Sequence, residues 1–192
     1  EAFGRADGTP ALRGFPDADP TIQKARDWLV SMQHEDGGWG LNDQDLRSDW
    51  HTAWAVLALS ADPTVSAVFQ AGRDWLVKVP VQRQTETDIV QSFSDILKMD
   101  LTLAGWPWGP DEASWVLPTA LAMLALRGET SDHEVSARIQ EAVNYLDNRR
   151  IPGGGWNVGN PVMFDGVLPV HTIPTALSVL ALGVNAPEKI LI

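Results

Sequence analysis

The 192-residue sequence contains no cysteine. This absence excludes a disulfide framework, a zinc site built on thiolates and a cysteine nucleophile. It leaves the redox compartment open, because a chain without thiols can fold in either environment. A single missing residue type thus removes several classes of mechanism.

Basic residues are scarce as well. The chain has 14 Lys and Arg against 25 Asp and Glu, a formal net charge of −11. Nucleic acids and anionic membranes are bound through clustered Lys and Arg, so we expect neither as a partner. No stretch approaches the roughly 20 apolar residues of a transmembrane segment, and residues 1–10 lack the features of a signal peptide. The sequence does not determine the compartment: it favours a cytoplasmic location over a processed secreted form, which the start at Glu leaves open.

Aromatic residues are few apart from tryptophan, which occurs nine times against one Tyr. With 44% hydrophobic residues, the chain can build the core of one domain. An excess of Trp in a chain of this size suggests a repeated unit that carries Trp.

Three similar apolar runs mark an internal repeat. They are TAWAVLAL at Thr52–Leu59, TALAMLAL at Thr119–Leu126 and TALSVLAL at Thr175–Leu182. Apolar residues occupy every face of these predicted helices, which is typical of helices buried on both sides. Pro118 and Pro174 suit the first turn of two of them. We interpret the three runs as an inner layer.

An amphipathic outer helix is predicted before each run. Apolar residues follow the 3.6-residue period in Thr21–Gln33, Val65–Val79 and Val135–Leu146. Between outer and inner helix comes a Gly-Trp turn, at Asp36–Gly40, Gly105–Gly109 and Gly153–Trp156. Glycine allows the sharp turn of the backbone at such sites.

The spacings indicate one ancestral unit. Trp28 to Trp39 and Tyr145 to Trp156 both span 11 residues, and Trp39 to Thr52 and Trp106 to Thr119 both span 13. Trp75 to Trp106 spans 31, which places an insertion at about residues 81–100. Its apolar residues have helical spacing, so it adds an amphipathic helix.

The predicted organisation is an all-α domain of helical hairpins in two layers. Residues 1–19 form an N-terminal arm, and residues 20–192 form one domain with units at about 20–61, 62–128 and 131–184. Asp19-Pro20 and Asp62-Pro63 each place an N-cap before a proline, which marks the start of a helix.

The stretch ARDWLVSMQHEDGGWG, Ala25–Gly40, resembles the QW repeat of squalene cyclases and related terpenoid cyclases. Protein prenyltransferases share the general architecture, an αα-toroid. The resemblance implies that Gln33, Gly38 and Trp39 brace the helix end and the turn, as Trp106 and Trp156 do in the later units. The position of Gln33 is occupied by Pro80 and Arg150 in those units, so the signature is complete in one copy.

Three hairpins are fewer than the five to six that the resemblance implies for a closed toroid, so we expect an incomplete toroid or arc. Solenoid-like units expose apolar faces at both ends unless these are capped. We expect a partner to cover the ends, including Lys189–Ile192. The partner is a second copy of the chain or a missing segment that completes the toroid.

Known chemistry of the related families is not found in this sequence. The resemblance to squalene cyclases implies a DxDD acid motif, but the nearest string is Asp17-Ala18-Asp19-Pro20, where helix capping explains Asp19. The zinc site of the prenyltransferases and the thioester of complement-like toroids both require Cys. We predict neither a metal site nor a cofactor, and Asn42–Asp49 lacks the EF-hand pattern.

Polar residues near the starts of the inner helices are the remaining candidates for catalysis. The candidates are Asp49, His51 and Glu112, and the same regions hold Asp111, Asp165 and His171. Asp49 and Glu112 could form a carboxylate pair for acid-base work in a carbohydrate lyase or hydrolase. A metal site of His51 and His171 is a weaker hypothesis than a polar residue at a helix entrance.

Binding is the other role considered for this region. The candidates to line an apolar ligand pocket are Trp50, Trp54, Trp115 and His171, with core packing as the alternative for the three Trp. Three functions follow: a terpenoid-cyclase-like repeat domain that binds a hydrophobic, isoprenoid-like small molecule, a non-catalytic protein-interaction scaffold, and a carbohydrate-active enzyme. The sequence leaves open whether the chain is an enzyme.

Overall fold

The computed structural model describes residues 20–60, 62–85, 87–128 and 132–185. The elements are α1 (Pro20–Ser31), α2 (His51–Leu59), a 3-10 turn η1 (Pro63–Val65), α3 (Ser66–Lys78), α4 (Asp88–Leu97), β1 (Trp106–Pro107), β2 (Ser114–Trp115), α5 (Val116–Ala125), α6 (His133–Asn148), β3 (Val162–Met163), β4 (Gly166–Val167) and α7 (Thr172–Asn185). The predicted arm and Lys189–Ile192 lie outside the described residues.

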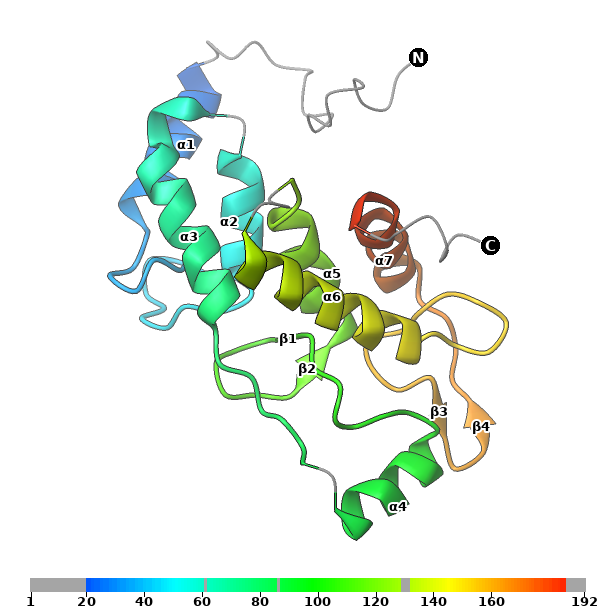
Figure 1. Ribbon diagram of the computed structural model, residues 1–192. Coiled ribbons are helices and arrows are strands. Elements are labelled where there is room, and N and C mark those ends of the chain that lie inside the picture. Colours follow the sequence, from blue (N-terminus) through cyan, green and yellow to red (C-terminus); the bar gives the residue numbers. More distant parts are fainter. Residues whose placement is uncertain (1–19, 61, 86, 129–131, 186–192) are drawn as a thin grey trace, which may run out of the picture.

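Two layers of helices enclose the core (Figure 1). Helix α5 packs between α2 and α7, while α1, α3 and α6 lie on the outer side, each against the inner helix that is its neighbour. Every residue of α5 except Leu117 is buried, as its all-round apolar sequence predicts. The prediction of an all-α fold is confirmed, and the arrangement as an incomplete toroid or arc stays a prediction.

Capping residues fix where helices begin. The Asp132 side chain accepts hydrogen bonds from the backbone N–H of Glu134 at 2.8 Å and so caps α6. The Asp62 side chain accepts from Thr64 N at 2.9 Å, with Pro63 as the first residue of η1. Asp19, the other predicted cap, lies outside the described residues.

Two antiparallel ladders of two residues each were not predicted. Trp106 pairs with Trp115 in β1–β2, and Val162 pairs with Val167 in β3–β4. The second hairpin turns at Phe164 and Asp165, which both have positive φ, 49° and 62°. Strands this short leave no alternating pattern in the sequence, which explains why the pattern of apolar residues did not reveal them.

The two ends of the inner layer expose positions that are buried inside it. On α7, Val179 and Leu180 are 54% and 57% exposed, whereas Val56 and Met123, which match Val179 in the repeat, are fully buried. On α2, Trp54 is 47% exposed, whereas the matching Leu121 is fully buried against its neighbours. At both ends, therefore, the exposed positions are ones whose counterparts inside the chain pack against an adjacent unit.

Helix α4 is the amphipathic helix predicted in the insertion at 81–100, and it lies apart from the two layers, beside β3 (Figure 1). None of its residues is buried, and its apolar residues Ile89, Phe93 and Ile96 are all about half exposed or more. Its first turn is capped by the Thr87 hydroxyl, which accepts from Val90 N at 3.2 Å. The insertion thus adds an apolar surface that the repeat itself lacks.

Candidate functional site

The Gly-Trp turns make the same set of hydrogen bonds in all three units. The indole Nε1–H of Trp39, Trp106 and Trp156 donates to the carbonyl of Leu29, Leu76 and Leu146 at 2.8, 2.8 and 2.7 Å. The backbone N–H of each Trp donates to the hydroxyl of Thr52, Thr119 or Thr175 at 2.9, 2.8 and 2.9 Å. Each turn is therefore tied both to the outer helix before it and to the inner helix after it.

Gln33 lies where unit 1 meets unit 2, and Gly38 lies inside the turn of unit 1. The Gln33 side-chain amide donates to the carbonyls of Gly37 and Val68, at 2.8 and 2.9 Å, and so connects the first turn to α3. A Cβ on Gly38 would approach the Ser48 side chain to 2.5 Å, so this position has no room for a larger residue. These contacts hold backbone in place and leave no group free for chemistry.

Asp36 joins the same turn to α3. Its carboxylate accepts from the Ser48 hydroxyl at 2.6 Å, from Gly38 N at 3.0 Å and from the Trp75 indole at 3.0 Å. Burial alone raises the pKa of Asp36, but these hydrogen bonds and the charge of His34 together lower it below its usual value. Asp36 is thus held as a carboxylate.

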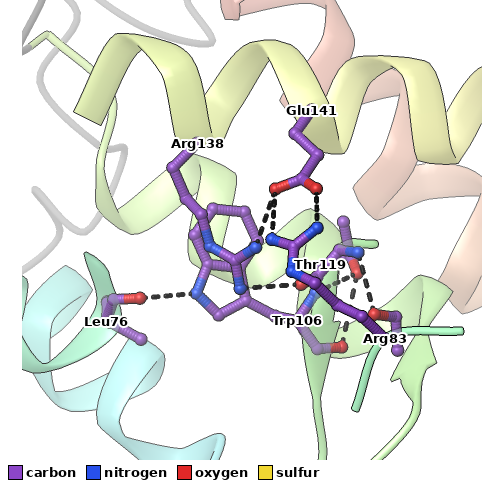
Figure 2. Close-up of polar contacts among 8 residues, drawn as sticks. Leu76, Arg83, Trp106, Thr119, Arg138 and Glu141 are labelled. Carbon is purple, nitrogen blue, oxygen red and sulfur yellow. Dashed lines mark hydrogen bonds and ion pairs between the residues drawn. The ribbon is translucent and has the colours of Figure 1, made fainter. Parts of the chain in front are cut away.

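Trp106 packs against Arg138, which belongs to a charged cluster that the sequence did not reveal. Figure 2 shows the Arg138 guanidinium over the indole ring, 4.4 Å from its centre, with an ion pair to Glu141 at 3.0 Å. Arg83 donates to both oxygens of the same carboxylate, one of which also accepts from Arg138. Although burial raises the pKa of Glu141, the two guanidinium groups lower it overall. Arg138 and Glu141 are three residues apart on α6, whereas Arg83 is far from both in the sequence, so no local pattern predicts that the three meet.

The candidate catalytic residues lie at the start of α2 and in the β1–β2 connection. The Asp49 carboxylate bonds to the His51 ring at 2.7 Å and accepts from His51 N at 2.8 Å, so it caps the first turn of α2. Glu112 is exposed, and its carboxylate accepts from Gly109 N at 3.3 Å. The structure thus uses Asp49 and Glu112 in local turns, and their role in catalysis stays a prediction.

The four candidate ligand-binding residues are dispersed. Trp50 packs edge-on against Trp108 at 4.8 Å, around a space of about 10 Å³. Trp54 and Trp115 line two separate cavities, and His171 is exposed at the start of α7, where its N–H donates to Trp156 O at 2.9 Å. The structure does not bring these residues into one pocket.

Trp54 lines what we call the end groove, a cavity of about 360 Å³ at the open side of unit 1. Trp28, Met32, Leu41 and His51 complete much of its wall. Because Trp54 matches a residue that packs against a neighbouring helix in units 2 and 3, this groove has the position of a contact surface between units.

Trp115 lines a second cavity of about 410 Å³, here called the α4 groove, between α4 and the ends of α5 and α6. Its wall is made by Gln82, Gln84, Ile89, Val90, Phe93, Met99, Leu101, Leu103, Ala113, Ser114, Trp115, Tyr145, Arg149, Gly159 and Asn160. Its size falls in the range of small-molecule sites, and it is mostly apolar with a few polar groups. The groove exists because the insertion places α4 opposite Trp115.

The described ranges contain neither a metal-binding cluster nor a membrane-spanning helix. Among these residues, no group of three or more His, Asp and Glu side chains could hold a metal ion. Within the same residues, no helix is long and apolar enough to span a bilayer.

The comparisons with known proteins find related sequences over part of the chain, while no family model matches it. The squalene–hopene cyclase of Bradyrhizobium diazoefficiens is 43% identical over 61 residues, which covers 26% of this chain and 9% of the relative. A probable squalene–hopene cyclase of Sinorhizobium fredii is 42% identical over 59 residues, covering 25% and 9%. The squalene–hopene cyclase of Zymomonas mobilis is 34% identical over 79 residues, covering 35% and 12%.

These matches support a relationship to the terpenoid cyclase superfamily and a cyclase-like repeat domain. The chain spans 9–12% of the length of the relatives in the matched stretches. The predicted family resemblance is confirmed at this level.

Proposed function

Since the chain is related to the terpenoid cyclases, we propose that it is a cyclase-like repeat domain that binds a hydrophobic, isoprenoid-like molecule in the α4 groove. The observation that carries this proposal is the apolar face of α4. Ile89 and Phe93 are 69% and 53% exposed and line a groove whose opposite wall includes Trp115 and Leu103. Large apolar side chains exposed together on a groove are typical of a binding surface.

The α4 groove is a better candidate for the ligand site than the end groove, because its apolar wall comes from the insertion and not from the repeat. Positions in the end groove match positions that pack against neighbouring helices within the chain, so the repeat itself accounts for their apolar character. No such pairing accounts for the apolar face of α4, which is absent from the other two units. The relatives are named squalene–hopene cyclases, which supports squalene and shorter isoprenoids as first probes.

The test is binding of farnesol by calorimetry and retention of squalene by native mass spectrometry, with two variants of α4. Ile89→Ser removes a side chain that lines the groove, whereas Ile96→Ser removes the same side chain from the same helix outside the lining. Burying an Ile side chain contributes about 1.5–3 kcal/mol. We expect Ile89→Ser to weaken binding roughly tenfold or more and Ile96→Ser to change it little.

If the unmodified chain binds neither farnesol nor squalene, the proposal is refuted. An equal effect of the two serine variants would move the site away from the α4 groove. Circular dichroism of both variants controls for loss of α4.

A second candidate, an interaction scaffold, is favoured by the exposed end faces. Val179 and Leu180 on α7 and Trp54 on α2 match positions that pair inside the chain, so a second copy could stack with the same contacts. Light scattering over micromolar concentrations tests this, with Leu180→Glu expected to reduce association and Gln140→Glu on the exposed side of α6 as the control. A monomer at all concentrations would rule out stacking of copies.

A further inference from the structure

Arg149 occupies a repeat position that is apolar in the other units. It follows Tyr145 by four residues, as Met32 follows Trp28 and Val79 follows Trp75. Val79 is buried and Met32 packs against the core. Arg149 is just as buried, at 5% exposure. A charged side chain where the pattern requires an apolar one is a local conflict of the kind found at functional sites.

The guanidinium of Arg149 lacks a full ionic partner in the part of the chain that the structure describes. It lies over the Tyr145 ring, 4.5 Å from the centre, and donates to the Asn148 side-chain oxygen. No Asp or Glu of the described residues forms an ion pair with it, although Asp100 attracts it at longer range. Burial lowers the pKa of Arg149, which reflects the cost of removing this charge from water.

The wall of the α4 groove has the composition of an anion site. Arg149 lines the groove together with three side-chain amides, those of Gln82, Gln84 and Asn160, and no lining residue is acidic. This is notable in a chain of net charge −11. The cavity on the other side of α4, by contrast, is lined by Asp88, Asp95 and Asp100.

Tyr145 adds no negative charge to the site. Burial raises the pKa of its hydroxyl to about 12, and the hydroxyl donates to Ser114 O at 2.7 Å. The groove therefore combines an apolar wall on α4 with one buried positive charge and neutral donors.

We infer that the α4 groove binds an amphiphile: an apolar chain against α4 and Trp115, and an anionic head, carboxylate or phosphate, at Arg149. This inference rests on the proposed function and narrows its ligand class. A planar guanidinium donates two parallel hydrogen bonds to either head group, which a neutral alcohol cannot accept with the same strength.

The experiment compares three ligands with one protein: farnesol, farnesoic acid and farnesyl phosphate, each titrated by calorimetry against the unmodified chain. We expect at least one anion to bind roughly tenfold or more tightly than farnesol. The two anions distinguish a carboxylate site from a phosphate site, and a preference for either supports the inference. Farnesol binding as tightly as both anions would overturn the inference and leave the proposed function intact. No binding by any of the three would overturn the inference, and it would refute the proposed function as well if squalene is not retained.

Variants at two adjacent arginines separate recognition from structure. Arg149→Met introduces the residue that unit 1 carries at the matching position, so we expect it to fold. Its preference for the anion should disappear. Arg150→Met is the control, because Arg150 is exposed and pairs with Asp147. If Arg149→Met keeps the preference for the anion, or Arg150→Met loses it, Arg149 does not bind the head group. Should Arg149→Met fail to fold, Arg149→Gln provides the same readout, and the comparison of ligands on the unmodified chain still decides.

Discussion

Replacing Thr119 by valine tests whether the Trp-Thr contact holds the two layers together. The Thr119 hydroxyl accepts from Trp106 N at 2.8 Å and donates to Trp115 O at 2.6 Å, in a fully buried position. Valine has nearly the same shape, so the variant removes hydrogen bonds without opening a cavity. The Trp106 N–H is then left buried without a partner.

The magnitude follows from these two bonds. An unpaired buried donor costs about 1–3 kcal/mol, and the lost bond to Trp115 O adds about 0.5–1.5 kcal/mol. We expect Thr119→Val to lower the free energy of unfolding by about 2–4 kcal/mol, and Tm by roughly 5–15 °C in a chain of this size. Thr175 makes the matching bond but is partly exposed, so water can replace its hydroxyl and the loss should be about 1 kcal/mol.

Urea and thermal unfolding followed by circular dichroism measure both variants. Thr172→Val is the control, since Thr172 is exposed at the start of α7, and its stability should change by less than about 0.5 kcal/mol. The reasoning is wrong if Thr119→Val is as stable as the unmodified chain, or if Thr175→Val loses more than Thr119→Val.

Two further predictions concern packing and pH. Gly72→Ala places a Cβ 2.7 Å from both Trp39 and Val56, so we expect a loss of about 1–3 kcal/mol. Gly183→Ala on α7 is the control: its Cβ meets nothing within 4 Å, so the free energy of unfolding should rise by about 0.5–1 kcal/mol. Unfolding curves in which Gly72→Ala is as stable as the unmodified chain would contradict the close approach of Trp39 and Val56 to Gly72. For Asp36, whose pKa is lowered in the folded state from 3.8, the carboxylate stabilises the fold at neutral pH, and this contribution is lost as pH falls through the folded-state pKa. Asp36→Asn should therefore be less stable at neutral pH and depend less on pH below about pH 4, and equal acid sensitivity of the two proteins would argue against this assignment.

The repeat made much of the fold predictable from the sequence. The matching distances from Trp39 to Thr52 and from Trp106 to Thr119 predicted equivalent units, and both pairs are joined by the same hydrogen bonds. In unit 3, the spacing from Trp156 to Thr175 is longer, yet the same bond forms at 2.9 Å, because the β3–β4 hairpin occupies the additional residues.

The candidate sites were less predictable, because they depend on distances between units. Trp50, Trp54 and Trp115 all lie at or near the start of an inner helix, but they line three different cavities, even though Trp50 and Trp54 are only four residues apart. The sequence could not predict the α4 groove, because the amphipathic pattern at 81–100 predicts a helix but not the surface that this helix faces. Arg149 could have been found from the sequence, by comparing it with Met32 and Val79 at the same repeat position.

The exposed faces of α2 and α7 also determine the order in which the molecule loses structure. In a linear stack, each unit is held by its own contacts and by those with its neighbours, and α5 is the inner helix with a neighbour on both sides. Opening therefore begins at either margin and proceeds inward, so the amide hydrogens of α5 exchange with solvent last. Anything bound to α2 or α7 at the margin would slow that exchange across the whole chain, without touching α5 itself.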